Sequence, residues 1–382
     1  MPASTTAEEL RGRIRQLLEV AVAAGVTPSA VCAVSLGGQA LEPVAVGDAV
    51  RYGSDGTLLA PEDRVPARAE ALYDLASVTK IFSALTCLVL ADQGTLDLDA
   101  PVAETLASYR NGAERRTVTL RHLLTHTSGL PPVWPGWRGR PFPEAPPGIR
   151  DPLRRELLAD LLSTGLEHPP GQSFAYSCVG YNTAMAVAET AADTPWPELV
   201  TSRVLEPLGI PDLTFTPDPE RCAATEFCPE LHRGTVRGFV HDESAFVLGG
   251  AAANAGLFGT AEGLLEFGER LRQGFSGLLP EGLAAQMWTD QLPVVMGSAA
   301  GAARAQSGFG QGLGLRIGQA SWMGRSSARA RGHNGFTGTS LLTDRDRGIT
   351  LVLLTNRVHP SRSASVANPL RAAVADAVFA AA

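Results

Sequence analysis

The first 25 residues carry apolar side chains at helical spacing, separated by charged and small residues. The apolar positions are Leu10, Ile14, Leu17, Leu18 and Ala21. This spacing predicts an amphipathic helix. A hydroxyl side chain at Ser4, Thr5 or Thr6 is suited to cap its first turn.

Two other regions alternate between apolar and polar residues, which is the pattern of half-buried strands. Residues 28–49 alternate on both sides of Gly37-Gly38, and this predicts a β-hairpin. Near the end of the chain, residues 336–343 and 349–356 form two strand-like runs joined by a short polar turn. They predict a second hairpin.

Helical patterns dominate the middle of the chain, with long proline-rich connections between them. The apolar run at residues 81–90 predicts a buried helix, and Gly94 stands where that helix could end. A further amphipathic helix is expected from Pro369 onward.

Strands near both ends with helices between them predict an α/β (α+β) fold. We expect an antiparallel sheet flanked by helices and built from both termini, with an inserted all-helical domain. In this interpretation residues 1–76 and 241–382 form an α/β sandwich domain, and residues 77–240 form the insertion. The active site would lie in the cleft between them, since such clefts are favoured ligand sites.

Composition narrows the possible functions. The chain has 382 residues and a formal net charge of −7, so a nucleic acid is a poor candidate partner. The longest apolar run is well short of the roughly 18 residues that suggest a membrane span. We therefore expect neither nucleic acid nor a membrane as a partner.

The cysteines and the first residues of the chain indicate the cellular compartment in which the protein works. Residues 1–25 do not resemble a secretory signal, and the five cysteines form no C-x-x-C pair. An odd number of cysteines fits free thiols in a reducing compartment. We therefore expect a cytoplasmic location.

Neither a metal nor a cofactor is expected. His122 and His126 have the spacing of a zinc pair on a helix, but the glutamate of H-E-x-x-H is missing. The G-x-S-x-G of α/β-hydrolases and the G-x-G-x-x-G of dinucleotide-binding folds are both missing as well.

Lys80 is the most informative residue, because it is the only lysine among 32 basic residues. Unlike arginine, a buried lysine can lose its proton near neutral pH and act as a general base. Ser77 lies three residues upstream, so both side chains would share one face of the first turn of the helix predicted at 81–90. The Ser77 N–H would then point out of the helix N-terminus, where it could stabilise an oxyanion. A lysine left by chance in an arginine-rich chain would give the same S-x-x-K spacing.

This chain resembles a known family in several segments, which occur in the same order as in that family. It resembles the serine hydrolases of the β-lactamase and penicillin-binding-protein fold, on the class C β-lactamase and esterase side. The matching segments are 73–80 (YDLASVTK), 94–102 (GTLDLDAPV), 120–130 (LRHLLTHTSGL), 169–177 (PPGQSFAYS) and 332–338 (GHNGFTG). The resemblance implies a nucleophile at Ser77, activated by Lys80.

The resemblance also implies a second motif, Y-x-N, whose tyrosine hydrogen-bonds the nucleophile and carries protons. Here the motif is Tyr176-Ser177-Cys178. The tyrosine is present and could act as the base, whereas a thiol replaces the amide that helps to hold the lysine and the substrate. Recognition of substrates should therefore differ from that of β-lactamases.

The third motif is K-T-G in penicillin-binding proteins and often H-x-G in the esterases. Here it is His333-Asn334-Gly335, and Gly335 would allow the substrate to approach the backbone closely. The resemblance implies that the Phe336 N–H is the second oxyanion donor. It also implies that His333 lines the pocket as a hydrogen-bond donor or an acid.

Two more segments are candidates for substrate contact. Residues 131–149 are rich in proline and contain Trp134 and Trp137, which could form a wall of the pocket or belong to an ordered surface loop. His241 begins a polar cluster that could bind a substrate group or simply form a capped turn.

These residues predict acyl transfer through a covalent intermediate on Ser77. The partner would be a small-molecule ester or amide, and water as acceptor would make the enzyme a hydrolase. An amine or alcohol acceptor would make it a transacylase. A hypothesis from another class is a catalytically silent ligand-binding module, against which the complete set of Ser77, Lys80 and Tyr176 argues.

Overall fold

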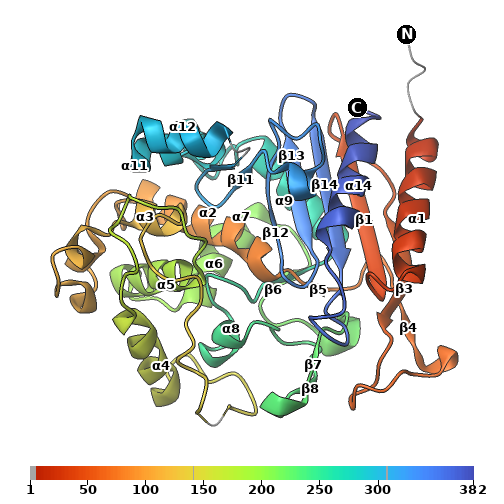
Figure 1. Ribbon diagram of the computed structural model, residues 1–382, viewed down its shortest axis with the longest axis horizontal. Coiled ribbons are helices and arrows are strands. Elements are labelled where there is room, and N and C mark those ends of the chain that lie inside the picture. Colours follow the sequence, from red (N-terminus) through yellow and green to blue (C-terminus); the bar gives the residue numbers. More distant parts are fainter. Residues whose placement is uncertain (1–5, 141, 307–308) are drawn as a thin grey trace.

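The computed structural model describes residues 6–140, 142–306 and 309–382 (Figure 1). Two of the expected helix caps, Ser4 and Thr5, lie outside these residues. The third, Thr6, caps α1 (Ala7–Ala23): its Oγ1 accepts from the Glu9 N–H at 3.2 Å, and the Glu9 carboxylate accepts from the Thr6 N–H at 2.7 Å. This reciprocal pair satisfies two N–H groups that the helix itself cannot.

A large antiparallel sheet is assembled from the two ends of the chain. Its strands follow the order β10-β11-β12-β13-β14-β1-β3-β4, and β2 pairs with β1. They are β1 (Ser29–Leu36), β2 (Gln39–Ala40), β3 (Val44–Val50), β4 (Val65–Pro66), β10 (Gly310–Gln311), β11 (Arg316–Ile317), β12 (Arg331–Asn334), β13 (Ser340–Asp344) and β14 (Ile349–Thr355). The central pair joins β1 to β14, with Ala33 opposite Val352. Both predicted hairpins are therefore present, and they lie side by side.

The sheet has a hydrophobic core on each face, because its side chains alternate in direction. Cys32 and Val34 pack with α1 and with α14 (Asn368–Phe379), which run beside each other on the outer face (Figure 1). Val31 and Ala33 point the other way, into the larger core beneath α9 (Ala261–Arg272). The result is a helix–sheet–helix arrangement, as the sequence predicted.

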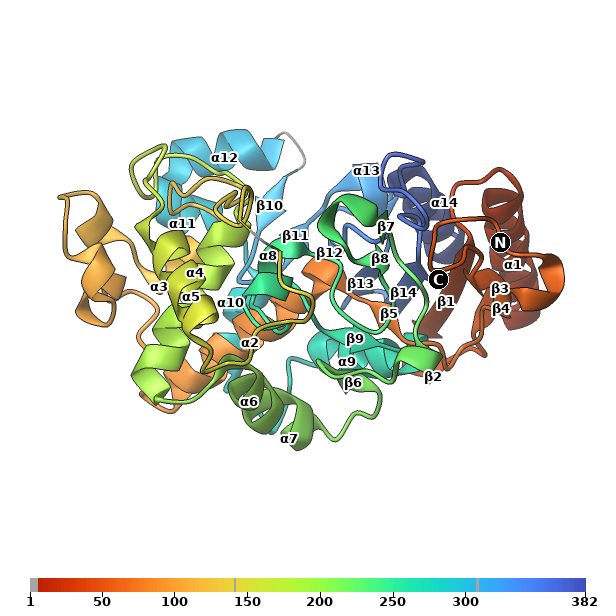
Figure 2. The ribbon, with the colours of Figure 1, turned by 90° about the horizontal axis from the view of Figure 1, so that it is seen from below.

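With one exception, the remaining helices gather beyond α9, on the side of the molecule away from α1 (Figure 2). They are α2 (Thr79–Asp92), α3 (Leu120–Leu124), α4 (Pro152–Ser163), α5 (Cys178–Ala192), α6 (Trp196–Val200), α7 (Glu206–Leu208), α8 (Glu243–Val247), α10 (Glu281–Trp288), α11 (Leu292–Met296) and α12 (Ser298–Gln306). The exception is α13 (Ala320–Met323), which packs on α14. Short strands connect them in two small sheets. These are β5 (Tyr73–Asp74), β9 (Phe258–Gly259) and β6 (Leu213–Thr214), and the pair β7 (Phe227–Cys228) and β8 (Gly234–Thr235).

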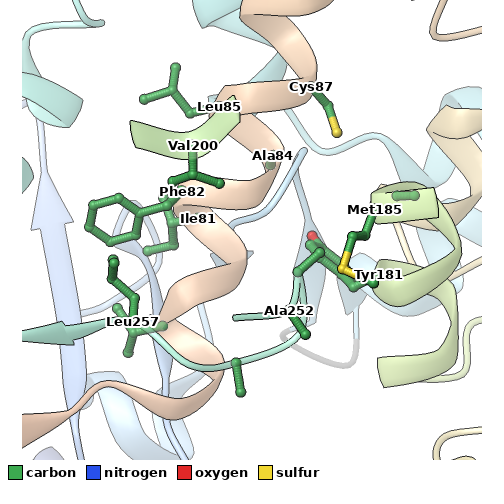
Figure 3. Close-up of a cluster of buried hydrophobic side chains, with 14 of the residues drawn as sticks. Ile81, Phe82, Ala84, Leu85, Cys87, Tyr181, Met185, Val200, Ala252 and Leu257 are labelled. Carbon is green, nitrogen blue, oxygen red and sulfur yellow. The ribbon is translucent and has the colours of Figure 1, made fainter. Parts of the chain in front are cut away.

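Helix α2 is the buried centre of this helical region. All its residues from Thr79 to Leu90 are buried. Figure 3 shows its apolar side chains, Phe82 and Leu85 among them, facing Val200 and Leu257, with Tyr181 and Met185 of α5 nearby. A helix packed on all sides is a rigid support for residues at its N-terminus.

We propose that the domain boundaries lie at residues 76/77 and 240/241. In support of this, the strands of the large sheet come only from residues 29–66 and 310–355. Among the described residues, no helix combines the length and apolar content that crossing a membrane would require.

Two local predictions were wrong. The strand expected at 336–343 begins only at Ser340, because the Gly335 N–H donates to Thr339 O at 2.7 Å and closes a turn over residues 335–339. Ser77 does not lie in the first turn of an α-helix. It lies in a 3₁₀ turn (Ala76–Val78) that leads directly into α2.

Candidate active site

The N-terminal end of α2 brings Ser77 and Lys80 together. The 3₁₀ turn is fixed by Asp74, whose Oδ1 accepts from the Ala76 N–H at 2.8 Å. Ala76 has φ +47°, a conformation that an L-residue rarely adopts and that is found preferentially at functional sites. This backbone directs the Ser77 side chain toward Lys80, whose Nζ lies 3.1 Å from Ser77 Oγ.

Lys80 is completely buried and held by groups from three parts of the chain. Besides Ser77, its Nζ donates to the backbone oxygen of Asn254 at 2.8 Å and lies 3.5 Å from Cys178 Sγ. Burial alone would lower the pKa of Lys80, but its electrostatic interactions with Cys178 and Tyr176 raise it above its ordinary value. Lys80 is therefore an ammonium at neutral pH, and not the neutral amine that burial alone would favour.

Tyr176 stands immediately before α5, above the lysine. Ser177 caps that helix, its Oγ accepting from the Gly180 N–H at 2.9 Å. The Tyr176 ring centroid lies 5.0 Å from Lys80 Nζ and 4.6 Å from Cζ of Arg316. Its buried hydroxyl has no hydrogen-bond partner among the described residues. The resemblance implies a hydrogen bond between Tyr176 and Ser77. In this structure Ser77 Oγ is hydrogen-bonded by Lys80 instead.

His126 supports the tyrosine from behind. The two rings lie 4.5 Å apart, and His126 Nδ1 accepts from the Ser177 N–H at 3.1 Å. Burial, together with the charges of Lys80 and Arg316, lowers the pKa of His126 well below its ordinary value, so the ring is neutral. His122 hydrogen-bonds Thr119 instead, and the described residues contain no cluster of metal-ligating side chains.

The turn after β12 is tied directly to the Ser77 segment. Thr337 Oγ1 donates to Asp74 O at 2.8 Å, and Thr339 Oγ1 donates to Leu75 O at 2.9 Å. A Cβ on Gly335 would lie 2.3 Å from Thr339 Oγ1 and 2.6 Å from Leu75 O, so only glycine fits between the two segments. The backbone amides of Ser77 and Phe336 are therefore carried by segments that cannot move independently.

His333 does not lie where it was expected. It ends β12 as a buried side chain behind Tyr176, with the two ring centroids 6.0 Å apart, and it is not part of the cavity wall. Its Nδ1 hydrogen-bonds Asn334 O at 2.8 Å. Burial, with the charges of Arg316 and Lys80, lowers the pKa of His333 well below its ordinary value. A neutral, enclosed imidazole is poorly suited to act as an acid on the substrate.

This arrangement matches an established family along most of the chain. The Beta-lactamase family model covers residues 14–376. The chain belongs to the Beta-lactamase family. Its relatives include Esterase EstB of Burkholderia gladioli, which is 33% identical over 347 residues, covering 82% of this chain and 84% of the esterase. A putative D-alanyl-D-alanine carboxypeptidase of Escherichia coli (strain K12) is 27% identical over 349 residues, covering 85% of this chain and 77% of that protein.

Solved structures confirm the fold of this Beta-lactamase family member. "EstCE1, a hydrolase with promiscuous acyltransferase activity" superposes with a TM-score of 0.73 at 23% identity, covering 98% of this chain and 99% of that one. The predicted α/β fold class, with an antiparallel sheet flanked by helices, is thus confirmed. Residues 77–240 are mainly helical but also contain β6, β7 and β8. The family model and the esterase and carboxypeptidase relatives confirm that this is a serine-hydrolase-type enzyme.

A cavity of about 510 Å³ opens at Ser77 of this family member. Its inner wall includes Ser77, Tyr176 and Cys178, and the H-N-G turn contributes Asn334, Gly335 and Phe336. The cavity therefore gathers most of the residues proposed from the sequence.

The two tryptophans of the proline-rich segment have separate positions. Trp137 lines the cavity, whereas Trp134 is buried in the hydrophobic core. Trp134 Nε1 donates to Asp160 Oδ2 at 2.8 Å, and this bond ties the segment to α4. The structure thus places only Trp137 where it could touch a substrate.

His241 also lines the cavity, at the end away from Lys80. Its ring stacks against Phe336 with the centroids 5.7 Å apart, and its Nε2 lies 2.8 Å from Glu226 Oε2. Arg362 binds the same carboxylate oxygen at 2.6 Å. Burial alone would raise the pKa of Glu226, but the hydrogen bonds from His241 and Arg362 lower it to about 2.

Several arginines were missed by the sequence analysis. Arg316, Arg357 and Arg371 line the cavity, and within the described residues none of them forms an ion pair with a carboxylate. In a chain where nearly every basic residue is arginine, no pattern distinguished these three. Asn254 could not be predicted either, because it binds Lys80 through its backbone oxygen, which every residue has.

Proposed function

We propose that this enzyme transfers acyl groups through an ester formed on Ser77. One observation carries the proposal: Ser77 Oγ lies 3.1 Å from the Nζ of a fully buried lysine, at the wall of a cavity large enough for a small molecule. Lysine and serine at this distance form an activated nucleophile.

The proposed reaction begins with attack of Ser77 Oγ on the carbonyl carbon of a small-molecule ester or amide. In the reactive form Tyr176 is a phenolate beside the Lys80 ammonium, and it takes the proton of Ser77 to become a phenol. The N–H groups of Ser77 and Phe336 bind the oxyanion of the tetrahedral intermediate. Tyr176 then returns the proton to the leaving alcohol or amine, and the acyl-enzyme remains.

The second half-reaction decides between two outcomes. Attack by water gives a carboxylic acid and makes the enzyme a hydrolase, which is the proposal we favour because Esterase EstB is 33% identical over 82% of this chain. Attack by an amine or alcohol makes it a transacylase, and the structural similarity to EstCE1 supports this second candidate.

The rim of the cavity indicates an apolar portion of the substrate. Three of the large apolar side chains that remain exposed line this cavity: Val133 at 61%, Phe336 at 49% and Val366 at 70%. Exposed apolar side chains grouped around a site mark a binding surface. We propose that an aliphatic or aromatic group of the ester lies against them.

The thiols support a reducing compartment. All five cysteines are free, and four of them are buried. Because free thiols persist where disulfides are kept reduced, we propose that the enzyme works in the cytoplasm.

The deciding experiment is covalent labelling with a fluorophosphonate, followed by intact-protein mass spectrometry. The wild type should gain one adduct and Ser77→Ala none. Ser83→Ala is the matched control, because Ser83 is a buried serine in α2, the helix that follows Ser77, and it donates to Ala253 O. Labelling of Ser77→Ala would overturn the assignment of the nucleophile. A folded wild type that takes no label would favour the silent binding module.

Turnover then distinguishes the two candidate reactions. p-Nitrophenyl esters of increasing acyl length are incubated with and without an added alcohol or primary amine. Hydrolysis alone supports the hydrolase, whereas a transfer product that exceeds the acid formed supports the transacylase.

A further inference from the structure

The side chain of Arg371 reaches from the C-terminal helix α14 to the turn that carries Phe336. It is 5% exposed, and its Nη2 donates to Gly335 O at 2.6 Å and to Thr339 O at 2.9 Å. Its Nη1 donates to Asn368 Oδ1 at 2.8 Å. These contacts place a guanidinium directly behind the turn.

Gly335 O, which Arg371 binds, belongs to the peptide group that also carries the Phe336 N–H. Gly335 C=O and Phe336 N–H are the two ends of one planar amide, so fixing the oxygen also fixes the direction of the N–H. A cation at the oxygen withdraws electron density through the amide and makes the N–H a stronger donor. Arg371 is thus positioned to act on the second oxyanion donor without touching the substrate's carbonyl.

The charge on Arg371 is not needed merely to hold the turn. Within the described residues no carboxylate pairs with it, and its Nε is buried without a partner. Burial and the nearby charges of Arg357 and Arg316 lower its pKa to about 9, so it remains charged at neutral pH. Burying an uncompensated cation is unfavourable, and neutral donors such as Thr337 and Thr339 already tie the turn to its surroundings.

We propose that Arg371 is a positioning residue for the oxyanion hole, orienting and polarising the Gly335–Phe336 peptide. The proposal rests on the acyl transfer proposed above. It gives the C-terminal helix α14 a part in catalysis. The sequence does not suggest this part, because Arg371 is far from Ser77 along the chain.

The test compares esters with thionoesters, in which sulfur replaces the carbonyl oxygen. Sulfur accepts hydrogen bonds poorly, so thionoester turnover depends little on the strength of the oxyanion donors. For a neutral ester, Arg371→Met should lower kcat about 10- to 100-fold, a fraction of what loss of a whole donor causes. For the matching thionoester the loss should be less than about threefold. A purely structural role would lower both rates equally.

Two further variants complete the experiment. Arg371→Lys keeps a cation but not the planar fork, and should give an intermediate ester-to-thionoester ratio; it also serves if Arg371→Met does not fold. Arg154→Met is the matched control, since Arg154 is 4% exposed but pairs with Glu189 away from the cavity. It should lose stability and keep the wild-type ratio.

The outcomes separate this proposal from the proposed function. If wild type and Arg371→Met are both labelled by the fluorophosphonate but their ester-to-thionoester ratios are equal, only the role of Arg371 is wrong. If the wild type itself takes no label, the acyl transfer and the role of Arg371 fail together.

Discussion

The Lys80 ammonium has three acceptors of different kinds around it: a hydroxyl, a backbone carbonyl and a thiol. Ser77 Oγ, Asn254 O and Cys178 Sγ lie at 3.1, 2.8 and 3.5 Å from Nζ. An ammonium has three N–H bonds and no lone pair, so it can serve all three at once. At the scale of single residues, this coordination explains why an ammonium suits position 80 better than a guanidinium does.

Replacing Lys80 should therefore be severe even when the charge is kept. We expect Lys80→Arg and Lys80→Met each to lower kcat/KM for esters by at least about 100-fold, because a planar guanidinium cannot replace a compact ammonium in a fully buried site. Steady-state kinetics on variants with native circular dichroism measures the effect. Retention of more than about a tenth of the activity by Lys80→Arg would contradict the role given to this lysine.

The catalytic residues differ in how far the sequence could reveal them. Ser77, Lys80 and Tyr176 stand in recognisable motifs, and the structure brings them to one place. Their roles remain predictions. Asn254 and Arg371 could not be found in this way, because one acts through its backbone and the other depends on a contact between residues 371 and 335.

At the scale of elements, hydrogen bonds between the turn at 335–339 and the Ser77 segment determine the geometry of the site. Two threonine hydroxyls, from Thr337 and Thr339, bind consecutive carbonyls of residues 74 and 75. They set the separation of the two proposed oxyanion donors, which belong to elements more than 250 residues apart in sequence.

Removing one of these hydroxyls should affect catalysis more than stability. For Thr337→Val we expect a loss of about 1 kcal/mol in the free energy of unfolding, and a fall in kcat of about tenfold or more because the donors are displaced. Thr86→Val is the control, since Thr86 is equally buried and donates to Phe82 O at 2.9 Å within α2. Equal kcat losses in the two variants would contradict this.

Elements were more predictable than their boundaries. Period and composition located both hairpins and the helices at either end of the chain. The start of β13 was misplaced because residues 336–339 have strand-like side chains but are held in a turn by Gly335 and by the threonine bonds. Contacts of that kind depend on tertiary structure, which a local pattern does not contain.

At the scale of the whole molecule, a partly buried ionic cluster links the loop at residue 226 to the cavity and to the segment after β14. Glu226 accepts hydrogen bonds from His241 and Arg362, and Arg362 also binds Glu243 at 2.5 Å. The cluster connects parts of the chain that lie on both sides of the site.

Acid should weaken this connection. The Glu226 pKa is about 2 in the folded protein and about 4.3 when unfolded. A lowered pKa stabilises the fold above the unfolded value, and this contribution disappears as the pH falls toward 2. Between about pH 5 and pH 3, the free energy of unfolding should therefore fall more steeply for wild type than for Glu226→Gln.

Denaturant titrations at several pH values measure the two slopes. Glu230→Gln, which changes an exposed carboxylate nearby, is the control and should behave as the wild type does. Identical slopes for wild type and Glu226→Gln would show that the cluster does not contribute to acid stability.

The pairing of β1 with β14 also has a consequence for the order in which the protein is made. A ribosome completes residues 29–36 more than 300 residues before their sheet partner, residues 349–355. Until residues 349–355 have been made, β1 of the apolar first hairpin has one edge without a partner strand. Unpaired strand edges promote association between chains. Because Phe336 and Arg371 also appear late, an incomplete nascent chain carries Ser77 and Lys80 without the second half of the site. Acyl transfer by this enzyme can begin only once the segment that contains Phe336 and Arg371 has been made and has folded against Ser77.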